Sequence, residues 1–397
     1  MNSAPITHSA DGTGGPDGSG SGDGRGSGDE LRARAEILKI ARLLDVEPDT
    51  LAFLRTLPVD DVRRFREQSV AALFDRAPEM LDRIAAATKL VPAGVAAAIS
   101  QKALGPRLAA AVAGRLEPAR AADIIEKLPV AFTAESCGHL DPRRIEGIVG
   151  RLDENLVVRI AVALAERGDH LTMGRFVGHL PDSALRRILP QVDDAAVLRT
   201  GFAIDVPERL GQIIELMGPE RLASVIASAA GEGLWPEALA VASMVTGEQR
   251  GRIASLAAAQ PQDRLDSLVT TVAAQNLWES LLPLVALLTE DERRAVAALP
   301  SLRGGDVLGG VVRAVVATGL WAEFLPLVEA LPADSRKTVA DTAGALPAAA
   351  LDAMALEVDK RDLWELVMPL VELMDDEAKT RIFELPAFQE QAGQPGP

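Results

Sequence analysis

Tryptophan recurs at a fixed interval in the C-terminal part of the chain, and this interval constrains the fold more than any other feature. The four residues are Trp235, Trp278, Trp321 and Trp364, each 43 positions after the one before and each preceded by leucine. A period of this length is typical of repeat proteins in which each unit buries its apolar face against its neighbours. We therefore expect the tryptophans to be structural anchors in the core between units. The alternative is an exposed row that grips a ligand.

Each 43-residue unit has room for three short helices. In the third unit the apolar spacing predicts helices over residues 324–331, 333–346 and 348–363. A proline stands five residues after the last three tryptophans. We expect it in a first helical turn, where a missing amide donor is tolerated.

The middle of the chain has a shorter period of 12 residues. Its apolar anchors are Leu104, Leu116, Leu128, Leu140, Leu152 and Leu164, followed after a shift of 16 by Leu180, Val192, Ile204 and Leu216. Each 12-residue unit predicts one helix of roughly eight residues and a tight turn, with proline or an acidic residue starting the next helix. Apolar residues inside the units recur at three and four positions, which excludes strands.

These two periods resemble known helical repeats. The 43-residue period is similar to that of HEAT and armadillo proteins, which implies an α-solenoid. The Leu-Pro-x-Asp-like turns of residues 104–216 resemble the N-terminal intracellular domain of MgtE-type magnesium transporters, a small right-handed superhelix. In that family the domain works beside CBS modules and a transmembrane channel, and we find neither pattern in this sequence. The resemblance therefore implies the fold and not the transport function.

The sequence thus predicts an all-α chain with four parts. Residues 1–28 are rich in Gly, Ser and Asp and predict a disordered tail. Residues 29–103 predict a helical cap that covers the first repeat. Residues 104–230 hold the 12-residue units, and residues 231–397 hold the tryptophan-marked units with a short C-terminal tail.

The formal net charge of −16 argues against nucleic acid as a partner, because binding nucleic acid requires a cationic surface. Residues 235–397 contain 24 acidic and 13 basic residues, so the acidity is concentrated there. No apolar stretch is long enough to predict membrane insertion or a signal peptide. A single cysteine excludes an internal disulfide and fits a cytoplasmic location.

The 12-residue register breaks once, between Leu164 and Leu180, where we expect a lengthened turn. Gly174 and Gly178 would share one helix face there and let another backbone approach closely. The candidate partner contacts in this segment are His170, Arg175, Phe176 and His179, the alternative being a tightly packed helix pair. In the acidic part the candidate contacts are Glu365, Glu372 and Asp376.

The sequence predicts no catalytic, cofactor or metal site. Cys137 and His139 are the only nucleophile and base close together, and two residues apart on a helix they point away from each other. Motifs for phosphate binding, zinc proteases and serine hydrolases do not occur. An enzyme of a familiar class is therefore disfavoured.

Stacked helical repeats offer long surfaces and supply no chemistry of their own. The sequence accordingly favours a non-catalytic scaffold that binds a basic or extended segment of a protein partner. One alternative is a regulatory module that responds to a ligand or a divalent cation. Another is a carrier of an apolar ligand.

Overall fold

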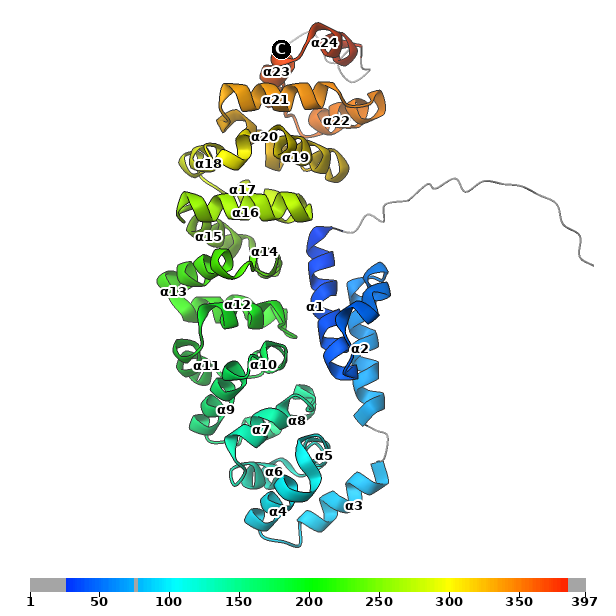
Figure 1. Ribbon diagram of the computed structural model, residues 1–397, viewed down its shortest axis with the longest axis vertical. Coiled ribbons are helices and arrows are strands. Elements are labelled where there is room, and N and C mark those ends of the chain that lie inside the picture. The colour runs from blue at the N-terminus through cyan, green and yellow to red at the C-terminus, as the bar shows by residue number, and fades with distance from the viewer. Residues whose placement is uncertain (1–25, 75–77, 385–397) are drawn as a thin grey trace, which may run out of the picture.

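The computed structural model describes residues 26–74 and 78–384, and every regular element within these ranges is a helix. The predicted all-α class is confirmed for this part of the chain. Figure 1 shows most of the helices stacked in one long row, with the first helices lying along its side. The predicted tail falls almost wholly outside the described residues, although the first helix already begins at Ser27.

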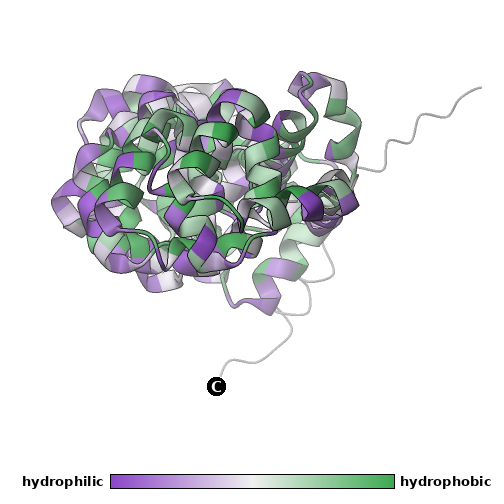
Figure 2. Ribbon diagram, turned by 90° about the horizontal axis from the view of Figure 1, so that it is seen from below, coloured by the Kyte–Doolittle hydropathy of each residue, from purple (hydrophilic) through white to green (hydrophobic). Residues whose placement is uncertain are grey.

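The N-terminal unit, as we call residues 27–74, consists of α1 (Ser27–Leu44), η1 (Pro48–Thr56) and α2 (Val59–Phe74). It has a small core of its own, in which Ile37 and Ile40 of α1 are buried together with Leu51, Leu54 and Val62. Seen from below, the unit lies outside the stacked helices, to one side (Figure 2). The remaining helices are called the array.

The N-terminal unit, which is the first part of the range 29–103 predicted to be a cap, does not lie at the end of the array. Helix α1 contacts α14 (Trp235–Ser243) and α17 (Trp278–Val285), far along the row. The end of the array is formed by α3 (Pro78–Thr88) and α4 (Ala93–Ile99), which contact α5 and α6. The physical reason is that α1 carries charged partners for the side of the array, as described below.

Short helices follow one another along the first half of the array, which ends with the 23-residue α13, bent at Gly218 where φ is 73°. They are η2 (Ser100–Leu104), α5 (Gly105–Ala113), α6 (Pro118–Ile125), α7 (Val130–Cys137), α8 (Pro142–Val149), α9 (Glu154–Glu166), α10 (His170–Val177), α11 (Asp182–Ile188), η3 (Leu189–Gln191), α12 (Asp194–Phe202), η4 (Pro207–Arg209) and α13 (Leu210–Glu232). Proline occupies the first helical position of α6 and α8, as predicted. Asp153 and Asp193 cap α9 and α12 by accepting from the amides of Leu156 and Ala196.

The four extra residues between Leu164 and Leu180 lengthen a helix and not a turn. Helix α9 has 13 residues, whereas α8 and α10 have eight each. The expected long turn is therefore wrong. Residues Ala161 to Ala165 carry no helix breaker, so the helix continues for one more turn before Gly168 ends it with a positive φ of 66°.

An arginine at a recurring position donates hydrogen bonds to the backbone of an earlier helix connection in the array. Arg209 and Arg221 each follow a Pro-Glu pair. Arg209 donates to the carbonyl of Leu180 at 3.0 Å, and Arg221 donates to the carbonyl of Val192 at 2.5 Å. Each also forms an ion pair with the aspartate two residues after that carbonyl, at 3.1 and 3.0 Å. These contacts satisfy carbonyls that the ends of short helices leave without an intrahelical donor.

The second half of the array contains the tryptophan-marked helices. They are α14, α15 (Gly247–Ala258), α16 (Gln262–Gln275), α17, α18 (Glu290–Ala297), η5 (Pro300–Arg303), α19 (Gly305–Thr318), α20 (Trp321–Ala330), α21 (Ala333–Gly344), α22 (Ala348–Lys360), α23 (Trp364–Leu373) and α24 (Asp376–Phe383). Each tryptophan is the first residue of its helix, three residues earlier than predicted for the third unit. The prolines at 283, 326 and 369 therefore lie inside their helices, and the expectation of a first-turn position is wrong.

The tryptophans lie in the largest hydrophobic core of the described chain. Trp235, Trp278 and Trp321 are 3, 3 and 5% exposed, and Trp364 is partly buried against the same core. Such burial leaves no indole face for a row that grips a ligand at the first three positions. The indole nitrogen of Trp235 donates to the hydroxyl of Ser267 at 2.9 Å, which satisfies its one polar atom.

No single helix among those described is both long and apolar enough to cross a membrane. Helices α21 and α22 are long and apolar enough only when they are taken together, and the chain bends by 116° between them.

Candidate functional site

Gly174 of α10 and Gly178, the C-cap residue of this helix, allow the loop after α12 to lie directly on it. A Cβ atom on Gly174 would stand 2.5 Å from the carbonyl oxygen of Ala203, and one on Gly178 would stand 2.7 Å from the Cβ of Val206. The amide of Asp205 donates to the carbonyl of Gly174 at 3.1 Å. The predicted close approach of another backbone is confirmed, and it fixes Asp205 at the surface that faces the N-terminal unit.

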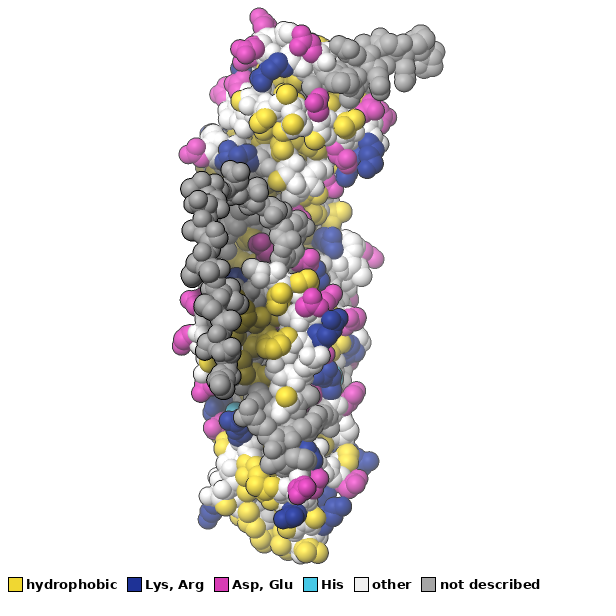
Figure 3. All heavy atoms as spheres, turned by 90° about the vertical axis from the view of Figure 1, so that its right-hand side faces the viewer, with side chains coloured by type: hydrophobic (Ala, Val, Ile, Leu, Met, Phe, Trp, Pro, Cys, Tyr) yellow, Lys and Arg dark blue, Asp and Glu magenta, His cyan; other side chains and the backbone are white. Residues whose placement is uncertain are grey.

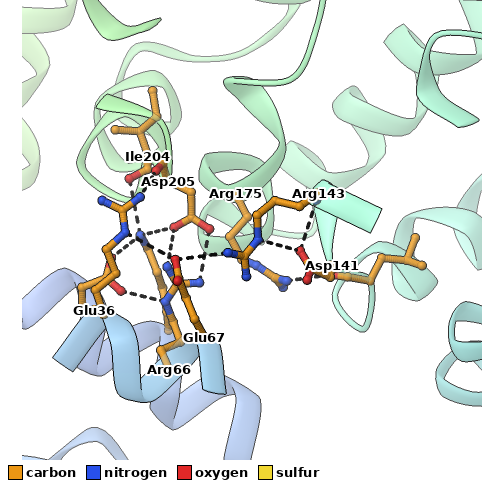
Figure 4. A network of polar contacts seen from close by, with 11 residues as sticks. Glu36, Arg66, Glu67, Asp141, Arg143, Arg175, Ile204 and Asp205 are labelled. Carbon is orange, nitrogen blue, oxygen red and sulfur yellow. Dashed lines mark hydrogen bonds and ion pairs between the residues drawn. The ribbon is translucent and has the colours of Figure 1, made fainter. Parts of the chain in front are cut away.

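Asp205 belongs to a buried ion cluster that joins the N-terminal unit to the array. The cluster consists of Glu36 and Lys39 of α1, Arg66 of α2 and Asp205 (Figure 4). Lys39 Nζ lies 2.6 Å from Asp205 Oδ1 and 2.9 Å from Glu36 Oε1. Arg66 Nε lies 2.7 Å from Glu36 Oε2, and its terminal nitrogens reach both oxygens of Asp205 at 3.2 and 3.3 Å. Two cations and two anions thus neutralise one another in the interior.

Burial and the neighbouring charges shift the pKa values of Asp205 and Arg66 in opposite directions. Burial raises the pKa of Asp205, but Lys39 and Arg66 outweigh burial and hold this pKa below its usual value. Burial lowers the pKa of Arg66, but Glu36 and Asp205 outweigh it and raise this pKa above its usual value. Asp205 and Arg66 therefore stay ionised at neutral pH.

Further charged contacts surround the cluster at the seam between the N-terminal unit and the array. Arg42 of α1 pairs with Asp169 at 2.9 Å, and Asp169 also caps α10 through the amide of Thr172. Arg143 of α8 pairs with Glu67 of α2 at 3.3 Å. The segment around the register break is thus a contact surface for the chain's own N-terminal helices.

Two of the predicted partner contacts in that segment, Arg175 and His179, line a polar cavity of about 120 Å³ beside the cluster. Arg66 and Asp205 line it as well. Arg175 donates to the carbonyl of Leu140 at 2.5 Å, and burial lowers its pKa below the usual value. Arg175 therefore fixes the turn between α7 and α8 while facing the cavity.

The other two residues predicted in that segment do not reach the cavity. Phe176 is 9% exposed and packs in the core of the first half of the array, which favours the packing alternative for this residue. His170 is the first residue of α10, and its Nδ1 is buried without a hydrogen-bond partner among the described residues. Burial lowers the pKa of His170, and the charge of Arg199 lowers it further.

Helix α1 docks on the tryptophan-marked helices through its N-terminus. The helix has no side-chain cap of its own, because its N-cap residue is Gly26. Glu279 of α17 supplies one, since its Oε2 accepts from the amide of Ser27 at 2.7 Å. The hydroxyl of Ser27 lies 2.5 Å from that of Ser280. We call the surface of α14 and α17 that holds α1 the docking face.

Apolar and charged contacts complete the docking of α1. Leu31 and Ala35, one turn apart, are 5% exposed and belong to the same core as the first three tryptophans. Arg34 pairs with Glu237 of α14 at 3.7 Å, and Glu237 is largely buried. Burying the side chain of Leu31 contributes on the order of 2 kcal/mol to docking.

Sequence reasoning missed Glu237, Glu279 and Asp205. Glu237 lies two residues after Trp235, and Glu279 lies one residue after Trp278, so the tryptophan register marks both positions. The predicted contact Glu365 lies one residue after Trp364, in the position that corresponds to Glu279. Glu365 and Glu372 are exposed on α23, and Asp376 is exposed on α24.

The described residues show little that could act chemically. Burial raises the pKa of Cys137 to about 12, so its thiol stays protonated at neutral pH. No three His, Cys, Asp or Glu side chains within residues 26–74 and 78–384 are grouped so that they could hold a metal ion.

Two apolar cavities of about 100 and 80 Å³ lie inside the array. The first is lined by residues from α10 through α15, and the second by residues from α13 to just after α18. Both are smaller than the cavity of about 150 Å³ that accepts benzene in an engineered protein core. They share Ile226, Ala238 and Ile253 in their walls.

No protein-family model matches this sequence, and no curated protein and no solved structure matches it significantly.

Proposed function

We propose that this protein is a non-catalytic α-solenoid scaffold that binds a helical, positively charged segment of a protein partner. The proposed repeats are the 12-residue units, which resemble the N-terminal domain of MgtE-type transporters, and the 43-residue units, which resemble HEAT repeats. Helices α6, α7, α8 and α9 begin at residues 118, 130, 142 and 154, and helices α14, α17, α20 and α23 begin at the four tryptophans. These equal intervals support the proposed repeats.

One observation carries the proposed function: the array already holds a helix on its side. Helix α1 lies on α14 and α17, buries Leu31 and Ala35, and receives its cap from Glu279. A surface that takes a helix of its own chain has the shape and the polar groups to take one from another protein. The surplus of acidic residues in the second half of the array favours a basic partner.

The test is capture of a partner from native lysate by the full chain, compared with a variant in which Glu365, Glu372 and Asp376 are replaced by lysine. We expect a stoichiometric protein partner for the unchanged chain and its loss from the variant. A matched control replaces Glu248, Asp263 and Asp334 by lysine, three acidic residues on other helices of the same half. Absence of a stoichiometric partner, or equal loss in both variants, would refute the proposed function.

A further inference from the structure

The docking face is built from two glutamates whose places recur 86 residues later. Glu237 follows Trp235 by two residues and Glu279 follows Trp278 by one. Two units onward, a glutamate again stands two residues after Trp321 and another one residue after Trp364. These are Glu323 of α20 and Glu365 of α23, and the described part of the chain places no N-terminal helix against them.

From this recurrence we infer that α20 and α23 form a second docking face, which takes a helix of another protein in the way that α14 and α17 take α1. The inference rests on the proposed function and adds the place and the chemistry of the partner. Glu365 would cap the first amides of the incoming helix, as Glu279 caps α1. Glu323 would pair with its basic side chain, as Glu237 pairs with Arg34.

The helices of the second face are arranged like those of the first. Helix α17 contacts α20 and α20 contacts α23, as α14 contacts α17. The tryptophan that starts each helix orients the glutamate that follows, because Trp235, Trp278 and Trp321 are buried in one continuous core and Trp364 packs against it partly buried. Figure 1 shows α20 and α23 beyond the end of α1, toward the C-terminus of the row.

Of the two glutamates of the second face, Glu323 has only a long ion pair within the chain and Glu365 is exposed. Oε2 of Glu323 is buried and accepts no hydrogen bond within the described ranges, and its ion pair with a guanidinium nitrogen of Arg361 is long, at 3.9 Å. A buried carboxylate oxygen without a donor is costly, and an incoming ammonium or guanidinium would satisfy it. Glu365 is exposed, as a carboxylate must be to cap an incoming helix.

The surroundings of the second face are apolar and acidic. In Figure 3, which looks at the side of the molecule that carries the N-terminal unit, exposed hydrophobic side chains gather over the C-terminal helices with acidic groups around them. Glu329 and Glu372 are exposed on α20 and α23, the two helices of the face. Such a surface favours an amphipathic helix with basic residues on its polar side.

The chemistry of α1 defines the partner. The helix should begin with small residues and without a capping side chain of its own, as α1 begins with Gly26 and Ser27. It should carry a large aliphatic residue four positions after its first residue and arginine or lysine seven positions after it, as α1 carries Leu31 and Arg34.

The experiment must keep the first docking face closed. The Ser27 and Ser280 hydroxyl oxygens are 2.5 Å apart, so the double variant Ser27→Cys and Ser280→Cys is positioned to form a disulfide that locks α1 in place. The natural Cys137 is buried with a pKa of about 12, which keeps it out of the exchange. The probe is a fluorescent peptide of residues 26–44 in which Ile37→Gln and Ile40→Gln remove the side chains that face the core of the N-terminal unit.

We expect the locked full chain to bind one equivalent of this peptide, measured by fluorescence anisotropy. Glu323→Gln and Glu365→Gln together should weaken binding at least about fivefold, because a cap and an ion pair are lost. Glu377→Gln, which removes one exposed charge from α24, is the control and should leave binding unchanged.

Two results would overturn the inference: no saturable binding to the locked chain, or equal weakening by the control variant, which would indicate general charge attraction. Dimers of the locked chain that dissociate on Glu365→Gln would identify the occupant as a second copy and would overturn the assignment to another protein. If the locked chain binds the peptide but captures no protein from lysate, the proposed function is refuted and this inference is not. If a partner is captured but replacing Glu323 and Glu365 does not change peptide binding, this inference is refuted and the proposed function is not.

Discussion

Replacing Gly174 by alanine tests the contact on which the placement of Asp205 depends. The new Cβ would stand 2.5 Å from the carbonyl oxygen, 2.6 Å from the carbonyl carbon and 2.7 Å from the Cβ of Ala203. These atoms belong to the backbone or lie next to it, so no side-chain rotation relieves the clash. Overpacking of this kind costs about 1–3 kcal/mol of unfolding free energy. The loop that carries Asp205 would have to move away from α10.

The matched control is Gly251→Ala in α15. Gly251 has no atom within 4 Å of an added Cβ and lies inside a helix, so alanine should stabilise the chain by about 0.5–1 kcal/mol. The two variants should therefore differ by about 1.5–4 kcal/mol in unfolding free energy, with opposite signs relative to the unchanged chain.

Two measurements follow the substitution. Urea unfolding monitored by circular dichroism gives the change in stability, and hydrogen exchange gives the protection of α1 and α2. We expect Gly174→Ala to lower the urea midpoint and to speed exchange in α1, because Asp205 loses its position beside Lys39. Equal stability of the two alanine variants, or an unchanged exchange rate in α1, would refute the link between the α10 glycine and the N-terminal unit.

Three other predictions concern separate parts of the chain. Burial lowers the folded-state pKa of His139 and of His170, so the unfolded chain takes up protons first as the pH falls, and the Tm should drop between about pH 7.5 and pH 5.5; replacing both by glutamine should flatten this dependence. Trp321→Ala should cost about 3–5 kcal/mol in urea unfolding, and Trp364→Ala clearly less, because only the first indole is fully buried; similar costs would contradict the anchor interpretation. Cys137 should react with a thiol reagent at pH 7 only after unfolding, and rapid reaction of the folded chain would disprove its burial.

Local patterns in the sequence predicted local structure well. The starts of α6, α8, α9 and α12 follow from a proline or an aspartate after an apolar anchor, because these residues fit the first helical position and the cap. The close approach over Gly174 and Gly178 also follows from their spacing, because residues four apart share one helix face. The all-α class and the burial of the first three tryptophans have the same local origin.

Details that depend on where a helix starts were less predictable. The spacing of apolar residues does not distinguish a helix that begins at Trp321 from one that begins three residues later. The indole can fill the core from the first helical position, so the proline falls in the second turn. In the same way, the four extra residues of α9 keep the apolar face in phase, since four residues make about one helical turn.

The docking of the N-terminal unit could not be predicted from the sequence, for a physical reason. Its contacts join residues that are far apart in the chain: 166 positions separate Lys39 from Asp205, and 252 separate Ser27 from Glu279. In the sequence Asp205 looks like another acidic residue after an apolar anchor, and Glu36 and Lys39 look like an exposed pair on one helix. Charged pairs across a seam leave no periodic pattern, whereas apolar faces do.

The ion cluster explains why α1 occupies one place on the array. Burying four charges removes their hydration, so the cluster contributes little net stability when complete. A shift of α1 by one turn would separate Lys39 from Asp205 and leave buried charges without partners, which costs roughly 3–5 kcal/mol. The cluster therefore selects the register of the N-terminal unit. The residue 86 positions after Asp205 is Asp291, which is 86% exposed and pairs with Arg294 of its own helix, so no buried ion cluster forms beside the second docking face. A helix bound there would be held by a cap, an ion pair and apolar contact alone, and this suits a partner that must associate and leave.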